Sequence, residues 1–335
     1  MDRSNLDLAI ARMTFLKAHE RVLLAQSLDR ADDLAVLSIT DLEKIIQRSF
    51  PRKTWQSADL LAAAERDRVE SERRGISFVS YTSDDYPPLL RELPDPPTVL
   101  FYRGTLPDPE KPLAGVVGTR HPSSEGSRIA YEIGRDFGKS GVAVVSGLAL
   151  GIDSLAHRGN ADAAAPTVAV LGCGLDSVYP ASNRALARRI VECGGALLSE
   201  YPCGTLPLKH HFPARNRIIA GLSRALVVVE APDHSGALIS ADFALDQGRD
   251  LWVVSGCLAT HAAEGCRKLV ADGARVARNA FDIVADWGLR VPSVAVPALS
   301  ICPANALSFG TRAAKLLELE LQTNTTVKPT PLGVR

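Results

Sequence analysis

Six short apolar runs lie between residues 113 and 256, and each ends in small or turn-forming residues. Each run is followed by a helical pattern or by a loop leading into one. This alternation predicts an α/β fold with a mostly parallel sheet and helices on both faces. Because such sheets bind ligands beyond the carboxyl ends of their strands, we expect the site at that edge. The runs are LAGVVGTR (113–120), VAVVSGLA (142–149), TVAVLGCG (167–174), ALLSEYP (196–202), ALVVVEAP (225–232) and LWVVSG (251–256).

The flanking segments have other patterns. Residues 1–75 carry apolar positions at helical spacing, and we expect a small helical domain there. Residues 76–112 are rich in proline, which excludes a continuous helix or a central strand and predicts a connector with edge strands. We place the α/β core at 113–288. A linker, one short helix and a tail are expected at 289–335.

Composition and charge are ordinary for a soluble globular protein, with 46% hydrophobic and 23% charged residues. The 38 basic side chains equal the 38 acidic ones, which argues against a general nucleic-acid coat but not against a local basic cleft. No apolar stretch approaches the roughly 18 residues that span a membrane, and the N-terminus is unlike a signal peptide. The six cysteines form no CxxC pair, so we expect no metal site and no disulfide framework, in a reducing cytoplasm.

The segment GTRHPSSEG (118–126) places a glycine at a strand end, then an arginine, then serines that open a helix. Backbone N–H groups at a helix N-terminus bind phosphate, and Arg120 could add a bidentate contact. The alternative is a plain turn with an exposed arginine. The predicted contacts are Gly118, Thr119 and Arg120.

Two further glycine-rich turns, SGLALGID (146–153) and GCGLDS (172–177), follow predicted strands. They are not a Walker A loop, because no GK[ST] occurs, and they are poor dinucleotide fingerprints, because GCGLDS lacks the third glycine. The alternative is that their glycines only permit tight turns. We expect His157 to be a packed histidine. The candidate contacts in these turns are Ser146, Gly147, Gly172 and Gly174.

The stretch LPLKHHFPARNRIIAGLSR (206–224) is the most unusual in the chain, because it gathers basic groups beside one aromatic residue. Cations mixed with an aromatic ring, on a loop entering a helix, suit a nucleic-acid backbone and one stacked base. The alternative is a solvated basic helix start. The two adjacent histidines lack the spacing of a metal pair. The candidate contacts are Lys209, His210, Phe212, Arg215, Asn216 and Arg217.

The segment VVVEAPDHSGAL (227–238) places Glu230 at a strand tip and Ser235 and Gly236 at a helix start, which predicts another anion-binding nest. Glu230 could be a general base, or it could orient Arg217 or Arg120, and we favour the second role. No Ser–His–Asp set or paired-carboxylate motif stands out. We therefore expect no catalytic residue and no cofactor.

Taken together, these motifs resemble the DprA/Smf family of DNA-processing proteins. GTR, SGLALGIDSLAH, GCGLDSVYPASN, SEYPCGTLPLKHHFPARNRIIAGLS and VVEAPDHSGALISADFALDQGRDLWVVSG carry the resemblance over roughly residues 80–256. It implies an extended Rossmann-like domain that binds and protects single-stranded DNA and helps load the recombinase RecA during transformation and recombination. It also implies a homodimer that acts without catalysis. On this chain it makes Arg120 and Lys209 the phosphate contacts and Phe212 a base-stacking or pocket residue.

Three departures from the family pattern stand out. Many members have YPKxN where this chain has YPASN, so Ala181 removes one cation, which Arg184 would partly replace. The N-terminal helical region is only weakly similar to the family's sterile-alpha-motif-like domain. Many members end in a winged-helix domain, in place of which this chain has a proline-rich linker and one predicted helix.

The alternative function is hydrolysis of a nucleotide, because the same sheet edge resembles that of the LOG phosphoribohydrolases. Those enzymes use a PGGxGTxxE motif, and this chain has APDHSGALISA in the comparable place. The missing glycines and glutamate count against hydrolysis. We therefore favour a non-catalytic protein of the cytoplasm with single-stranded DNA and RecA as partners.

Overall fold

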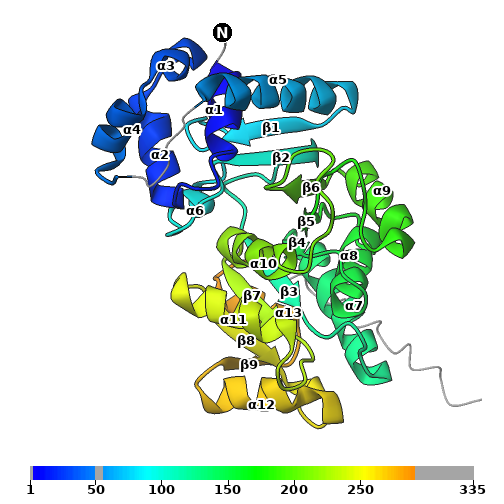
Figure 1. Ribbon diagram of the computed structural model, residues 1–335. Coiled ribbons are helices and arrows are strands. Elements are labelled where there is room, and N and C mark those ends of the chain that lie inside the picture. The colour runs from blue at the N-terminus through cyan, green and yellow to red at the C-terminus, as the bar shows by residue number, and fades with distance from the viewer. Residues whose placement is uncertain (1–2, 50–55, 291–335) are drawn as a thin grey trace, which may run out of the picture. The chain divides into compact units, whose positions relative to one another are not determined.

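A sheet of nine strands forms the centre of the part that this computed structural model describes, residues 3–49 and 56–290. Its strand order is β1-β2-β6-β5-β4-β3-β7-β8-β9 (Figure 1). Strands β3 to β9 are parallel, and β2 pairs in the antiparallel sense with both of its neighbours, β1 and β6. The six apolar runs are confirmed as six parallel strands. These are β3 (Leu113–Val117), β4 (Ala143–Ser146), β5 (Val168–Leu171), β6 (Ala196–Ser199), β7 (Ala225–Val228) and β8 (Asp250–Val254); β9 is Arg275–Ala277.

The strands are apolar on both faces because both faces are covered by helices. In β3, Ala114 and Val116 point into one buried cluster, while Leu113 and Val117 point into the other. This alternation follows from the two-residue period of a strand. The first face carries α7 (Ser124–Lys139), α8 (Ile152–Asp162), α9 (Arg184–Glu192) and α13 (Ala280–Asp286); the second carries α10 (His211–Leu222), α11 (Gly236–Asp246) and α12 (Glu264–Ala271).

The order in which the chain adds strands to the sheet reverses at β3. From β3 it builds β4, β5 and β6 on one side, and it then returns to add β7, β8 and β9 on the other. The loop after β3 leads to α7 on the first face, whereas the loop after β7 leads to α11 on the second face. Between two such loops a parallel sheet leaves a crevice, and ligands of α/β proteins bind there.

The proline-rich stretch supplies the outer strands β1 (Ser77–Ser80) and β2 (Val99–Gly104) and the short helix α6 (Pro88–Arg91). Strand β2 pairs with β6, so this stretch extends the sheet beyond the parallel strands. The prolines at 87, 88, 94, 96 and 97 all lie between β1 and β2, where no ladder hydrogen bond is lost.

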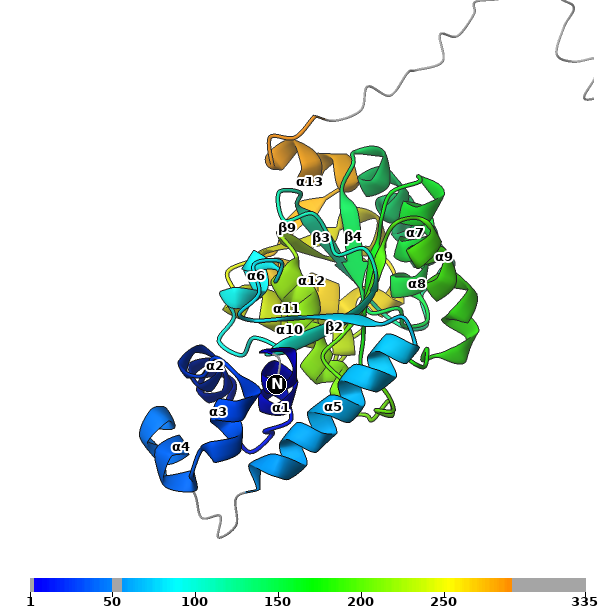
Figure 2. The same ribbon diagram turned by 90° about the horizontal axis from the view of Figure 1, so that it is seen from above.

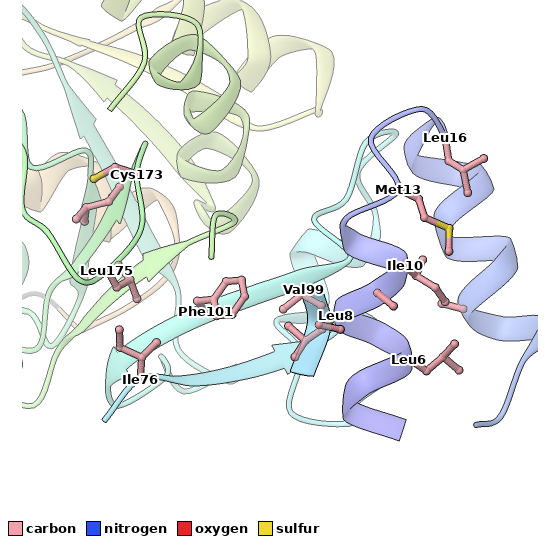
Figure 3. Packing of buried hydrophobic residues seen from close by; sticks show 14 of the residues in the cluster. Leu6, Leu8, Ile10, Met13, Leu16, Ile76, Val99, Phe101, Cys173 and Leu175 are labelled. Carbon is pink, nitrogen blue, oxygen red and sulfur yellow. The ribbon is translucent and has the colours of Figure 1, made fainter. Parts of the chain in front are cut away.

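Within residues 3–49 and 56–73, five helices precede the sheet, and as a group they pack against its β1–β2 end (Figure 2). Leu8 and Ile10 of α1 lie in one buried cluster with Val99 and Phe101 of β2 (Figure 3). The helices therefore share a continuous apolar core with the sheet rather than a separate one. They are α1 (Arg3–Ala11), α2 (Ala18–Ser27), α3 (Ala31–Val36), α4 (Ile39–Ile46) and α5 (Ser57–Arg73).

Three further expectations concern membrane-spanning helices, the cysteines and the C-terminal end of the chain. No helix among the described residues is long and apolar enough to cross a membrane. The five cysteines in the described ranges are unpaired thiols, and three of them are buried. The linker and helix expected at the C-terminal end lie, from residue 291 onward, outside the described residues.

His157 on α8 is fully buried, and its ring Nδ1 lies 2.7 Å from the Thr167 hydroxyl beside β5. The expectation of a packed histidine is thus correct. Burial lowers the pKa of His157 to about 3, because the charged imidazolium would lose its hydration. Neutral His157 therefore joins α8 to the sheet at neutral pH.

The low pKa of His157 makes stability depend on pH. The unfolded chain takes up a proton near the ordinary value of 6.5, whereas the folded chain does not until about pH 3. The stabilisation is complete above pH 6.5 and is lost as the pH falls toward 3, at about 1.4 kcal/mol per pH unit. We expect the free energy of unfolding, measured by urea denaturation, to fall less steeply over this range in His157→Gln. Equal slopes for the two proteins would contradict the assignment.

Candidate nucleic-acid interface

A cleft of about 700 Å³ lies at the crevice between the loops that follow β3 and β7. Helices α10 and α11, which are packed side by side on the second face of the sheet, provide one of its walls (Figure 1). The structure brings many of the predicted site residues together in this lining. They are Gly118, Thr119, Arg120, Lys209, Phe212, Arg215, Asn216, Ser235 and Gly236.

Arg120 and Lys209 are the available cations of the cleft. Both side chains are exposed, and neither has a hydrogen-bond or ion-pair partner within the described part of the chain. The guanidinium carbon of Arg120 lies 5.7 Å from the centre of the Phe212 ring, within cation–π range. Two unpaired cations beside an aromatic ring can bind a phosphate and hold a neighbouring planar group.

Arg215 is a buried cation in the wall of the same cleft. One nitrogen of its guanidinium donates hydrogen bonds to the carbonyl of Gly147, at 2.7 Å, and to that of Val170. Burial lowers its pKa, while the nearby Asp153 carboxylate favours the charged form. A Cβ atom at Gly147 would lie 2.6 Å from the guanidinium carbon. Gly147 is therefore a glycine because the arginine occupies that space.

The structure does not bring Arg217 to the cleft with Arg215 and Asn216. Its guanidinium is buried, with hydrogen bonds of 2.6 and 2.7 Å to Glu200 and an ion pair of 3.1 Å to Asp95. Successive residues of an α-helix are about 100° apart, so residues two apart point in nearly opposite directions. Arg217 is a structural ion-pair residue rather than a free phosphate ligand.

The N-terminus of α7 is already occupied by a carboxylate of the chain itself. The backbone N–H and the hydroxyl of Ser123 donate to Glu230 at 2.7 and 2.8 Å, and the Thr260 hydroxyl donates at 2.6 Å. A Cβ at Gly126 would lie 2.3 Å from a Glu230 oxygen, so glycine is needed there. Glu230 therefore orients neither Arg120 nor Arg217, and this helix end offers no vacant anion site.

The backbone N–H groups of the glycine-rich turn after β4 are likewise bound by a carboxylate of the chain. The N–H groups of Gly147 and Ala149 donate to the buried carboxylate of Asp153, at 3.0 and 3.4 Å. Ser146 is fully buried and donates its hydroxyl to the carbonyl of Val116. Of the two predicted contacts in this turn, Gly147 lines only a small side cavity, and Ser146 is outside the lining of the cleft.

In the turn after β5 the glycines allow neighbouring groups to pack closely. Gly172 lies against the Phe212 ring, where an added Cβ would come within 3.2 Å. The N–H of Gly174 donates to the carbonyl of Thr205, and Asp176 accepts from the N–H of Gly204. Gly172 and Gly174 thus support the aromatic ring and its loop without facing the cleft.

The N-terminus of α11 differs from the N-terminus of α7, because no carboxylate among the described residues is hydrogen-bonded to it. Its N-cap is Ser235, whose hydroxyl accepts a 3.3 Å hydrogen bond from the N–H of Ala237. Gly236 is exposed, and its carbonyl accepts a hydrogen bond from the Asn216 side chain. This helix end faces the cleft and carries the partial positive charge of the helix dipole.

Comparison with known proteins gives the family. The model for DNA recombination-mediator protein A matches residues 77–288. The chain belongs to this family. Protein Smf of Synechocystis is 44% identical over 223 residues, which are 65% of this chain and 56% of that protein. DNA processing protein DprA of Streptococcus pneumoniae is 39% identical over 208 residues, covering 62% of this chain and 73% of its own.

Two solved structures have the same fold. The crystal structure of DprA from Streptococcus pneumoniae aligns with a TM-score of 0.69 at 31% identity, covering 85% of this chain and 99% of that one. A DprA structure from Helicobacter pylori, described for its single-stranded DNA binding mode, aligns with a TM-score of 0.56 at 29% identity, covering 63% and 95%. The Rossmann-like α/β fold inferred from the motifs is confirmed by the first alignment.

The remaining predicted family contacts lie outside the lining of the cleft. His210 is exposed just before α10, and its ring packs edge-on against that of the buried His211. Arg184 is exposed at the first residue of α9. Sequence reasoning missed Tyr179, which lines the cleft. Its position in the sequence could have indicated this, because Tyr179 is an aromatic residue in the loop that follows β5, and such loops lie at the carboxyl edge of the sheet.

Two arginines of the cleft allow a matched test. We expect Arg215→Met to lower the free energy of unfolding by about 3–5 kcal/mol, because it leaves buried Asp153 without its cation and two carbonyls without their donor. Arg120→Met removes an exposed, unpaired side chain and is expected to leave that free energy nearly unchanged. Urea denaturation measures both. Similar stability of the two variants would show that Arg215 does not hold the cleft together.

Proposed function

We propose that this protein binds single-stranded DNA in the cleft between the loops after β3 and β7, without chemistry. The observation that carries this proposal is the placement of two cations without ion-pair partners among the described residues, Arg120 and Lys209, in a cleft that the Phe212 ring also lines. Cationic grooves with aromatic side chains bind unpaired strands because phosphates and base faces are both accessible. The description of the Helicobacter pylori relative, which concerns single-stranded DNA binding, supports the assignment.

The charge distribution also supports a local binding track. The whole chain has a formal net charge of zero, so attraction of DNA depends on cations that are not neutralised by neighbours. Many other arginines are paired, as Arg217 is with Glu200 and Arg275 with Asp286. The open N-terminus of α11 adds backbone N–H donors at the far side of the cleft. We assign Gly118, Thr119, Asn216, Ser235 and Gly236 to the same track.

The double variant Arg120→Ala, Lys209→Ala tests the cleft. We expect it to bind an oligo-dT strand more weakly, because two phosphate contacts are removed. Each such contact contributes about 0.7 to the dependence of log affinity on log salt for a single strand, so the slope should flatten by about 1.4. Fluorescence anisotropy over a series of salt concentrations gives both quantities.

A matched control is Arg188→Ala. Arg188 is an exposed cation of α9 without an ion-pair partner in the described ranges, and it does not line the cleft. We expect its removal to leave the slope unchanged. If the control flattened the slope as much as the double variant does, binding would be a property of the general surface charge. Unchanged affinity and slope in the double variant would exclude the cleft.

The absence of catalysis is part of the proposal, and the environment of Glu230 supports it. A carboxylate that acts as a general base must reach the substrate. Glu230 is fully buried and accepts hydrogen bonds from Ser123 and Thr260. We expect no release of free base when the protein is incubated with nucleoside monophosphates, as followed by chromatography. Turnover that is lost in Glu230→Gln would favour the hydrolase alternative.

The partners and the cellular role are proposals that follow from family membership. We propose that the protein acts in the cytoplasm as a homodimer that protects incoming strands and assists RecA loading in transformation and recombination. The division into a helical region that shares its core with the sheet (1–75), a connector (76–112), a DNA-binding domain (113–288) and a linker with tail (289–335) is proposed with it. Sedimentation and a RecA-loading assay on protein-coated strands are the direct tests.

A further inference from the structure

Two cavities lie at the amino edge of the sheet, where the parallel strands begin, opposite the edge that carries Arg120 and Lys209. The first, of about 500 Å³, is lined in part by Leu113 and Asp250, the first residues of β3 and β8. The second, of about 490 Å³, is lined in part by Gly104, which pairs with the first residue of β6. Residues that line both cavities join them into one surface, the amino-edge groove. The shared residues are Pro87, Pro88, Pro107, Asp108 and Pro109.

The free charges of the amino-edge groove are mostly carboxylates. Asp84 and Asp85 line the second cavity, while Glu110 and Asp250 line the first. All four side chains are exposed, and none of them has an ion-pair partner within residues 3–49 and 56–290. Asp108 adds a carboxylate to both cavities. The groove therefore presents carboxylates that can accept a cation from outside.

The cations that line the groove are engaged by other groups. Lys111 is paired with Asp108 at 3.2 Å. Arg249 is paired with Glu92 at 3.4 Å, and it also donates to two backbone carbonyls. Arg224 has no carboxylate partner among the described residues, but its guanidinium carbon lies 5.2 Å from the centre of a tryptophan ring. The unpaired charge of the groove is therefore predominantly negative.

Helix ends give the amino edge the same sign of charge. Helix α10 ends at Leu222 and α11 at Asp246, and both Leu222 and Gly248 line the first cavity. The last carbonyls of a helix carry a partial negative charge, which favours a nearby cation. The two edges of the sheet thus differ in charge, with free cations at the cleft and free carboxylates at the groove.

The walls of the groove indicate what kind of cation fits. Its surface is rich in proline rings, and Leu106 and the ring of Tyr102 line the second cavity. Lysine and arginine side chains pack their aliphatic stems on such apolar surface and keep the charged end in water. Among the described residues there is no cluster of three or more side chains that could hold a metal ion. The groove therefore suits basic side chains better than a bare metal ion.

We propose that the amino-edge groove is a docking site for a basic segment of a partner protein. The stems of its lysine or arginine residues pack on the proline walls, and their charged ends pair with Asp84, Asp85 and Glu110. This inference goes beyond the proposed function, because a polyanion such as DNA is repelled from a negative edge. A protein partner and a DNA strand could then occupy opposite edges of the same sheet.

A blocked, fluorescently labelled tetralysine peptide is the probe, and fluorescence anisotropy at low salt measures its binding. We expect Asp84→Asn combined with Asp85→Asn to weaken binding about fivefold, the effect of losing two surface ion pairs. Glu110→Gln, in the other cavity, is expected to weaken it about twofold. The control combines Asp29→Asn with Asp59→Asn, which removes the same charge from exposed positions outside both cavities. Its affinity for the peptide is expected to stay unchanged.

Each outcome supports or overturns the proposal. A loss of affinity in the groove variants without a loss in the control supports it. Equal losses in the control would show that the peptide follows general surface charge, and no binding to the unaltered protein would likewise overturn the proposal. Spermine carries as many ammonium groups as the blocked peptide, so spermine binding of equal strength and equal sensitivity to the variants would assign the groove to a small polyamine. None of these measurements involves DNA, so the proposed function stands or fails separately.

Discussion

The geometry of the cleft depends on one buried arginine. Arg215 reaches from the first turns of α10 to the carbonyls of Gly147 and Val170, at the ends of β4 and β5. These bonds join a helix on one face of the sheet to two strand ends, so the position of α10 is tied to the edge where the cleft lies. Because Phe212 and Asn216 are carried by the same helix, their positions relative to Arg120 follow from this contact.

A second constraint is that the chain fills two of its own anion sites. Asp153 accepts from the turn after β4, and Glu230 accepts from the N-terminus of α7. In an α/β protein these are the places where a nucleotide phosphate would bind. Because internal carboxylates occupy these places, the proposed binding of a polyanion depends on side-chain cations and on the N-terminus of α11. This arrangement suits a strand that lies across the edge better than a mononucleotide enclosed within it.

The strands and the position of the cleft could be predicted from the sequence because both depend on local patterns. Apolar runs that end in small or turn-forming residues indicate buried parallel strands, and the basic stretch 206–224, which contains α10, indicates the cleft. The roles of Arg217 and Glu230 could not be predicted, because each depends on partners that are distant along the chain. Glu230 is bonded to Ser123, which is 107 residues away, and Arg217 is paired with Glu200 and Asp95. Only the folded chain shows which cations are already neutralised.

The pairing of Arg217 extends beyond the α/β core. Asp95, which binds its guanidinium, also lies 3.9 Å from Arg21 on α2 in the helical region. Helix α10 therefore carries Phe212 and Asn216 toward the cleft and Arg217 toward an ion-pair cluster that includes the N-terminal helices. The Arg217–Glu200 pair is mostly buried and therefore costly to break once one partner is lost, so it restrains the orientation of α10. The Arg21 pair is longer and its carboxylate is 56% exposed, so the N-terminal helices add only a weak electrostatic restraint to this cluster, and the position of α10 depends mainly on Arg215 and on the Arg217–Glu200 pair.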